Sequence, residues 1–170
     1  MTDLPALLDS ERIRCGCDIR SKKRALQTVA ELMGESLRTG AAAGGDGNGG
    51  DGTESAVSDM AILDALTTRE RLGSTGIGHG IALPHARLAN IDEPLAALIT
   101  LKEGVDFDSI DGEPVDVVVG LLVPEHCNDE HLKILADLAK RFSDQELRRT
   151  LRTCRSGEAL LAELSAAPGA

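Results

Sequence analysis

The sequence predicts an α/β domain in which helices cover both faces of a β-sheet. Two apolar runs, Leu95–Leu101 and Val115–Val123, are almost continuous, as expected of strands buried on both faces. Segments with a helical spacing of apolar residues mix with these runs along the chain, which is typical of layered α/β folds. With 170 residues, 42% of them hydrophobic, we expect residues 1–170 to form a single domain.

The first half of the chain is predicted to contain two helices separated by a loop. Apolar residues recur with helical spacing from Ser21, which can cap a helix, to about Arg38. The stretch Gly40–Gly52 is rich in glycine, so we expect a flexible insertion; its single irregular Gly/Asp copy does not form a stack of calcium-binding repeats. Thr53 can cap a second helix that runs to about Arg69.

A glycine-rich segment and three further helices are expected in the second half. Gly73–Gly80 is too rich in glycine for a helix, and Ile81–His85 is predicted to be a short strand that stops at Pro84. After the two apolar strands, helices are expected from Asn128 or Asp129 to about Phe142, from Asp144 to Arg152, and from Ser156, which can act as a cap, to Leu164.

The composition excludes several classes of function. A net charge of −10 and the absence of Trp and Tyr argue against binding to nucleic acids or to anionic membranes. The N-terminus lacks the features of a signal peptide, and no apolar run approaches the roughly 20 residues that cross a bilayer. We therefore expect a cytoplasmic protein that meets protein partners, with reduced structural cysteines and no cofactor or metal.

Chemistry is concentrated in the segment Gly73–Arg87, where four glycines and two hydroxyl residues lead into Pro84 and His85. A histidine that accepts a phosphoryl group must present one ring nitrogen while the other is held as a donor. Glycines let backbone N–H groups approach a phosphate, and a proline stiffens the chain before the imidazole. His85 fits these needs, although on the residues alone a plain glycine-rich turn is the simpler interpretation.

Other chemistries lack their motifs. The glycines match neither the phosphate-binding Walker loop nor the dinucleotide fingerprint. The spacing of His126, Cys127 and His131 is not that of a zinc site, and a hydrolase that uses His85 and His131 would lack a nucleophile motif. His79 and His126 are interpreted as bystanders, and Ser74 and Thr75 as turn residues or, less favoured, as phosphate donors.

A family resemblance favours the phosphoryl acceptor. The run TRERLGSTGIGHGIALPH, from Thr68 to His85, closely resembles the active-site signature of enzyme IIA domains of the mannitol/fructose class of the phosphoenolpyruvate-dependent phosphotransferase system, and most of all their nitrogen-regulatory type. Shorter matches lie in order along the chain, so the resemblance extends from Leu4 to Ser165. They are Ser21–Leu26, Phe107–Asp111, Pro114–Asp116, Leu121–Pro124 and His131–Leu132.

The resemblance implies a fold and three roles. The family fold is a mixed, mainly five-stranded sheet with helices on both faces. The position of His85 takes a phosphoryl group from a histidine phosphocarrier protein, HPr or its nitrogen-branch relative NPr. His131 matches a second histidine beside it, and Arg69 matches the arginine of the T-R-E element, a charge stabiliser. Two departures are Ala86, where many members have glycine, and the length of the Gly40–Gly52 insertion.

We therefore predict a phosphoryl carrier that signals to regulatory target proteins through its phosphorylation state and does not turn over a small molecule. Arg69, Arg71 and Arg87 are expected to make the mouth of the site positive, and an apolar rim to dock the carrier in a small, transient interface. Two alternatives stay open: a sugar-transport IIA component that donates to a separate IIB protein, and a binding module whose His85 is never modified.

Overall fold

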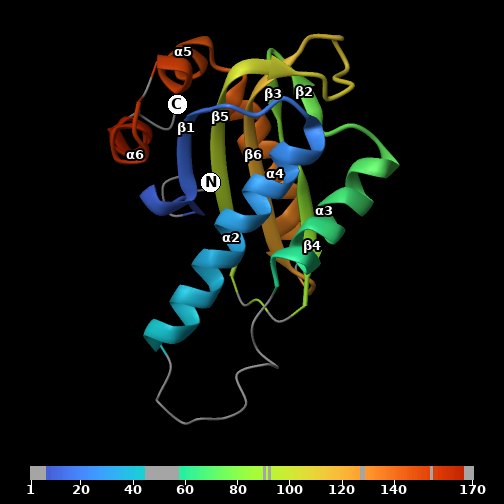
Figure 1. The fold of residues 1–170 in the computed structure, drawn as a ribbon, viewed down its shortest axis with the longest axis vertical. Helices are drawn as coiled ribbons and strands as arrows, with labels where there is room; N and C mark the ends of the chain where they lie inside the picture. Colours follow the sequence, from blue (N-terminus) through green and yellow to red (C-terminus); the bar gives the residue numbers. More distant parts are fainter. Residues whose placement is uncertain are drawn as a thin grey trace.

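A mixed β-sheet forms the centre of the computed structural model, which describes residues 7–44, 58–89, 91, 93–126, 129–153 and 155–166 (Figure 1). Its order is β1-β5-β6-β3-β2, and β4 follows β3 along the same side of β6. β1 and β5 are parallel, β5 and β6 antiparallel. The six strands are β1 (Ile13–Cys17), β2 (Gly76–Gly78), β3 (Ile81–Ala82), β4 (His85–Leu88), β5 (Leu95–Val105) and β6 (Val115–Pro124).

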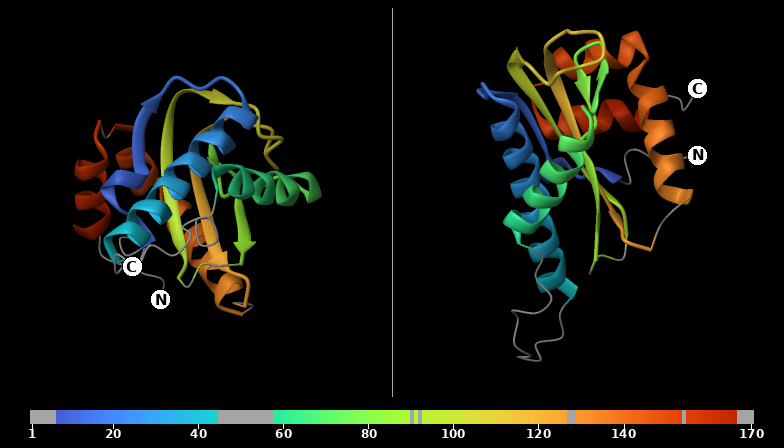
Figure 2. Two further views of the ribbon diagram at one scale, coloured as in Figure 1. Left: turned by 60° about the horizontal axis from the view of Figure 1, so that its bottom comes forward. Right: turned by 90° about the vertical axis from the view of Figure 1, so that its right-hand side faces the viewer.

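Helices cover both faces of this sheet, as Figure 2 shows in its right-hand view. The core on one face is formed with α2 and α3, and the core on the other with α4, α5 and α6. The helices are α2 (Lys22–Gly44), α3 (Asp59–Leu72), α4 (Asp129–Phe142), α5 (Gln145–Thr153) and α6 (Gly157–Ala166), with a short 3-10 helix η1 (Ser10–Arg12). The predicted layered α/β architecture is therefore confirmed.

Burial explains why the two long strands are so apolar. Nine of the ten residues of β6 are buried, because helices pack on both of its faces. Both phenylalanines, Phe107 and Phe142, are fully buried, one in each half of the core. In the part of the chain that the structure describes, no helix combines the length and hydrophobicity needed to cross a membrane.

The strand pattern differs from the prediction at three places. β1 and the glycine-rich β2 were not predicted. The strand predicted to stop at Pro84 was placed wrongly, because pairing with β6 resumes at His85. Proline lacks a backbone N–H but keeps its carbonyl, which accepts a hydrogen bond from the N–H of Leu121 at 2.9 Å. Pro84 therefore interrupts the strand without ending it.

The helix boundaries also differ in informative ways. α2 extends to Gly44, beyond the predicted end at Arg38, because an alanine run favours helix. The rest of the predicted insertion and the predicted cap Thr53 lie outside the described residues. α3 begins at Asp59, where the Ser58 hydroxyl caps it by accepting from the N–H of Ala61 at 3.1 Å. The predicted helix from Ser156 is confirmed, with Ser156 as its cap.

Candidate functional site

His85 is the first residue of β4, and its imidazole is half-buried. Its Nδ1 lies 2.8 Å from the carbonyl oxygen of Leu83, two residues earlier. A carbonyl only accepts, so Nδ1 carries the proton of this bond, and in the neutral ring Nε2 then carries the lone pair. The turn at Pro84 thus fixes both the orientation and the tautomer of the imidazole.

A groove of about 700 Å³ runs past this imidazole. Its lining comes from β4, α3 and α4. The two helices lie on opposite faces of the sheet (Figure 1). Most of the groove's surface is apolar or small, with three basic side chains including His85. The lining residues are Ala65, Thr68, Arg69 and Leu72 of α3, His85, Ala86 and Arg87 of β4, and Leu132 and Leu135 of α4.

The surroundings of His85 lower the pKa of its imidazole below the ordinary value of 6.5. Burial is the largest cause, because it disfavours the charged form, and the positive charge of Arg69 acts in the same direction. The bond to the Leu83 carbonyl and the negative charge of Glu70 act in the opposite direction. At neutral pH the ring is therefore neutral and keeps a lone pair.

Charged and apolar groups share the rim of the groove. Arg69 and Arg87 line it, and the Nη1 of Arg69 donates to the carbonyl of Gly73 at 3.1 Å. Arg71, which was expected to add positive charge, is not among the lining residues. Leu72 is 81% exposed and Leu132 66% exposed, one from each side of the groove. The predicted apolar rim and two of the three predicted arginines are thus present.

A buried carboxylate, that of Glu70, joins the elements around the site. Glu70, next to Arg69 in α3, is 7% exposed and forms an ion pair at 2.7 Å with Lys22 at the start of α2. The same carboxylate accepts hydrogen bonds from the N–H and the hydroxyl of Thr75, at 3.0 and 2.5 Å. Glu70 therefore ties α2, α3 and the glycine-rich segment together.

The glycine-rich segment forms the β2–β3 hairpin. The hydroxyls of the two residues before it form hydrogen bonds within the protein and do not face the groove. The Ser74 hydroxyl donates to the carbonyl of Phe107 at 2.5 Å, and the Thr75 hydroxyl is held by Glu70. A Cβ at Gly76 would overlap the side chain of Ser109. Gly76 therefore serves close packing of the hairpin, and both hydroxyls are engaged away from the groove.

The other histidines are placed as follows. His79 lies exposed at the tip of the hairpin, with φ +58°; its N–H donates to Asp111 and its carbonyl accepts from Arg152. His126 is exposed in the turn after β6. His131 lies in the first turn of α4, and its side chain lies outside the described part of the structure. Among the described residues, no cluster of three or more His, Cys, Asp or Glu side chains could hold a metal ion.

Sequence reasoning missed Glu70 and the particular leucines of the rim. A signal for Glu70 exists, because Ile62, Leu66 and Glu70 follow each other at steps of four on the buried face of α3. A carboxylate in such a row predicts a buried partner. No comparable signal marks Leu72 and Leu132, since exposure at helix ends depends on the tertiary arrangement.

The fold and the groove together define an α/β domain that presents a neutral histidine at the edge of its sheet, between arginines and exposed leucines. Residues 6–167 match the family model described as "Phosphoenolpyruvate-dependent sugar phosphotransferase system, EIIA 2". This match covers nearly the whole chain. The chain belongs to this family, and the resemblance seen in its sequence is confirmed.

Individual relatives agree with this assignment. The nitrogen regulatory protein of Pseudomonas aeruginosa is 39% identical over 140 residues, which are 82% of this chain and 80% of that protein. The crystal structure of nitrogen regulatory protein IIA-Ntr from Neisseria meningitidis is similar with a TM-score of 0.78 and 34% identity, covering 94% of this chain and 97% of that one. A fructose-specific EIIABC component of Bacillus subtilis is 38% identical over 102 residues, 60% of this chain and 16% of that protein.

Proposed function

We propose that this protein accepts a phosphoryl group on Nε2 of His85 from a histidine phosphocarrier, HPr or NPr, in the cytoplasm. The observation that carries the proposal is the bond between Nδ1 of His85 and the Leu83 carbonyl. It leaves the lone pair on Nε2, and the lowered pKa keeps that lone pair available at neutral pH. Family membership makes a phosphotransferase role the first one to consider.

The transfer step needs only positioning and charge. The Nε2 lone pair forms the new N–P bond while the N–P bond to the carrier's histidine breaks, and the electron pair of that bond returns to the carrier's imidazole. Arg69 and Arg87 line the groove and would offset the negative charge of the phosphoryl oxygens. His131, in the first turn of α4, is proposed as a helper that hydrogen-bonds these oxygens or the carrier's ring.

A signalling role is proposed because His85 lies in a groove with exposed leucines at its rim. Leu72 and Leu132 form an apolar rim suited to docking of a protein partner. Phosphorylation would place about two negative charges within that rim, which favours some partners and repels others. We propose that regulatory target proteins read this change, as the name of the nitrogen regulatory relatives suggests.

Labelling tests the assignment of His85. The protein is incubated with phosphoenolpyruvate, enzyme I and the histidine carrier, and intact mass is measured together with acid lability and alkali stability of the adduct. Wild type and His79→Ala, the matched control on the neighbouring hairpin, are expected to gain one phosphoryl group. His85→Ala is expected to gain none, and labelling of this variant would refute the proposal.

A second function, donation to a sugar-transport IIB protein, is favoured by the likeness to the fructose-specific component. It shares the first step and differs in the second. Chasing the phosphorylated protein with a fructose-type IIB domain separates the two. Rapid loss of label to a IIB cysteine supports transport, whereas a stable label supports the regulatory role.

A further inference from the structure

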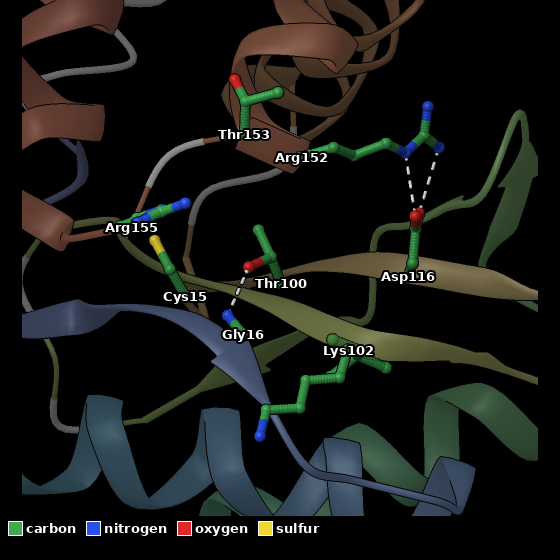
Figure 3. A pocket seen from close by; sticks show the side chains of 9 residues that line it. Cys15, Gly16, Thr100, Lys102, Asp116, Arg152, Thr153 and Arg155 are labelled. Carbon is green, nitrogen blue, oxygen red and sulfur yellow. Dashed lines mark hydrogen bonds and ion pairs between the residues drawn. The ribbon is translucent and has the colours of Figure 1, made fainter.

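A second cleft, of about 590 Å³, lies away from the His85 groove, between the sheet and the end of α5 (Figure 3). The two sites share no lining residue. Asp116, near the start of β6, borders this cleft, whereas His85 pairs with Leu121 farther along the same strand. The cleft is therefore not part of the groove already described.

Positive charge predominates in the cleft, although the chain as a whole carries −10. Lys102, Arg152 and Arg155 line it together with a single carboxylate, Asp116. Asp116 pairs with Arg152 in a two-pronged ion pair, with Nε–Oδ2 at 2.9 Å and Nη2–Oδ1 at 3.0 Å. Within the described part of the chain, no carboxylate pairs with Lys102 or Arg155. These two side chains thus keep uncompensated positive charges, and that of Arg155 lies over the cleft (Figure 3).

The floor of the cleft offers a hydrogen-bond donor. Thr100 is 6% exposed, and its hydroxyl oxygen accepts from the N–H of Gly16 at 2.8 Å. No described residue accepts the proton of this hydroxyl. Figure 3 shows Arg155 extending over the cleft beside Cys15 and Thr100, and Arg152 directed toward Asp116, whereas the Lys102 side chain runs to the opposite side of the strands. An anion between Arg155 and Thr100 would meet a guanidinium and a hydroxyl donor together.

We propose that this cleft binds a small anion with two or more carboxylate or phosphate groups. Its volume suits a metabolite-sized ligand. The guanidinium of Arg155 and the hydroxyl of Thr100 are donors from which both carboxylate and phosphate oxygens accept hydrogen bonds. Arg152 would hold the inner end of the ligand in place, because Asp116 already fixes its guanidinium.

The cleft also borders the hairpin that precedes His85. Nη2 of Arg152 donates to the carbonyl of His79 at 2.6 Å, and the carbonyl of Gly80 accepts from the N–H of Asp116 at 3.0 Å. A ligand at this place would therefore contact side chains that hold the hairpin, six residues or fewer before His85 in the sequence.

Titration followed by NMR tests the site. Inorganic pyrophosphate and citrate are added separately to the full-length protein, and the backbone amide shifts are mapped. Saturable shifts at Gly16, Thr100 and Thr153 are expected with at least one of the two, and the tighter one shows whether phosphate or carboxylate oxygens are preferred. Shifts confined to Ala65, Leu72 and Ala86 of the His85 groove would overturn the proposal, as would an absence of saturation at about 10 mM.

A matched pair of variants separates a built site from general charge. Arg155→Gln is expected to weaken binding about tenfold, because it removes a charge-assisted donor. Arg149→Gln removes the same charge from the exposed surface of α5 outside the cleft, so its affinity is expected to stay within about twofold. Equal losses in both variants would show that only the overall charge matters and would contradict the proposal.

Discussion

The β2–β3 hairpin and the His85 groove are adjacent in sequence but use their polar groups in opposite ways. In the hairpin, Thr75 is held by Glu70, and both backbone groups of His79 bond to side chains from other elements. The groove instead sets its basic side chains beside exposed leucines. We therefore interpret the hairpin as a support, and propose the groove as the surface that meets a partner. Changes in the first should affect stability, and changes in the second should affect transfer.

The largest effect on stability is expected from Glu70→Ala. It leaves the Lys22 ammonium, only 24% exposed, without its close partner, and removes the acceptor for Thr75. Loss of one partner of a buried pair costs about 3 kcal/mol in the free energy of unfolding. Urea unfolding followed by circular dichroism measures this cost.

Glu31→Ala is the control for that variant. Its carboxylate is exposed and accepts a hydrogen bond from Gln27 on the same helix, so we expect a change below about 0.5 kcal/mol. Equal stability of the two variants would show that Glu70 does not support the hairpin.

Arg69→Gln should produce the opposite pattern. Removal of its charge from the groove is expected to slow phosphorylation about tenfold, or about 1.4 kcal/mol, with little change in stability because the side chain is at the surface. Arg71 lies two residues away and does not line the groove, so Arg71→Gln should leave the rate of phosphorylation unchanged. Initial rates of labelling measure both, and equal rates for Arg69→Gln and wild type would remove this arginine from the site.

Arg152→Gln tests the contacts of the hairpin with α5 and β6. The ion pair with Asp116 is partly exposed, at 38% and 29% of the two side chains, so its loss is expected to lower the free energy of unfolding by about 1 kcal/mol. Labelling of His85 should proceed at the wild-type rate at a temperature where the variant is folded. Strongly slowed labelling with unchanged stability would show that Arg152 takes part in phosphoryl transfer and does not merely hold the hairpin.

The smallest effect concerns pH. The pKa of His85 is below 6.5 in the folded protein, so the unfolded chain binds a proton first as the pH falls. The protein should therefore lose stability as the pH falls from about 6.5 toward the lowered pKa, and regain none of it at higher acidity. Urea unfolding of wild type and His85→Ala at pH 7.5 and 5.5 checks this; an identical loss in both proteins would contradict it.

Much of the fold follows from sequence patterns alone. The nearly continuous apolar runs of β5 and β6 predict buried strands, and helical spacing predicts α4 to α6 closely. β1 has few apolar residues and a glycine at φ +66°, so its pairing with β5 depends on tertiary contacts rather than on a local pattern. The same holds for β2, whose glycines are strand residues only because β3 pairs with them.

The site was predictable in part. The segment with Pro84 and His85 was selected from its residues, and the roles of His85 and Arg69 were proposed from the family resemblance. The structure brings the side chains of His85 and Arg69 to one groove. The glycines were interpreted as a phosphate cradle, whereas Gly76 packs against Ser109 from a distant loop. Such contacts join segments more than thirty residues apart, and no local pattern encodes them.

The central claim is that the hydrogen bond between Nδ1 of His85 and the Leu83 carbonyl directs the phosphoryl group to Nε2. Long-range 1H–15N and 31P NMR of the phosphorylated, 15N-histidine-labelled protein identifies the nitrogen that is bonded to phosphorus. We predict phosphorus on Nε2 of His85, with the Nδ1 proton still present. Phosphorus on Nδ1 of His85, or on another histidine, would contradict the account.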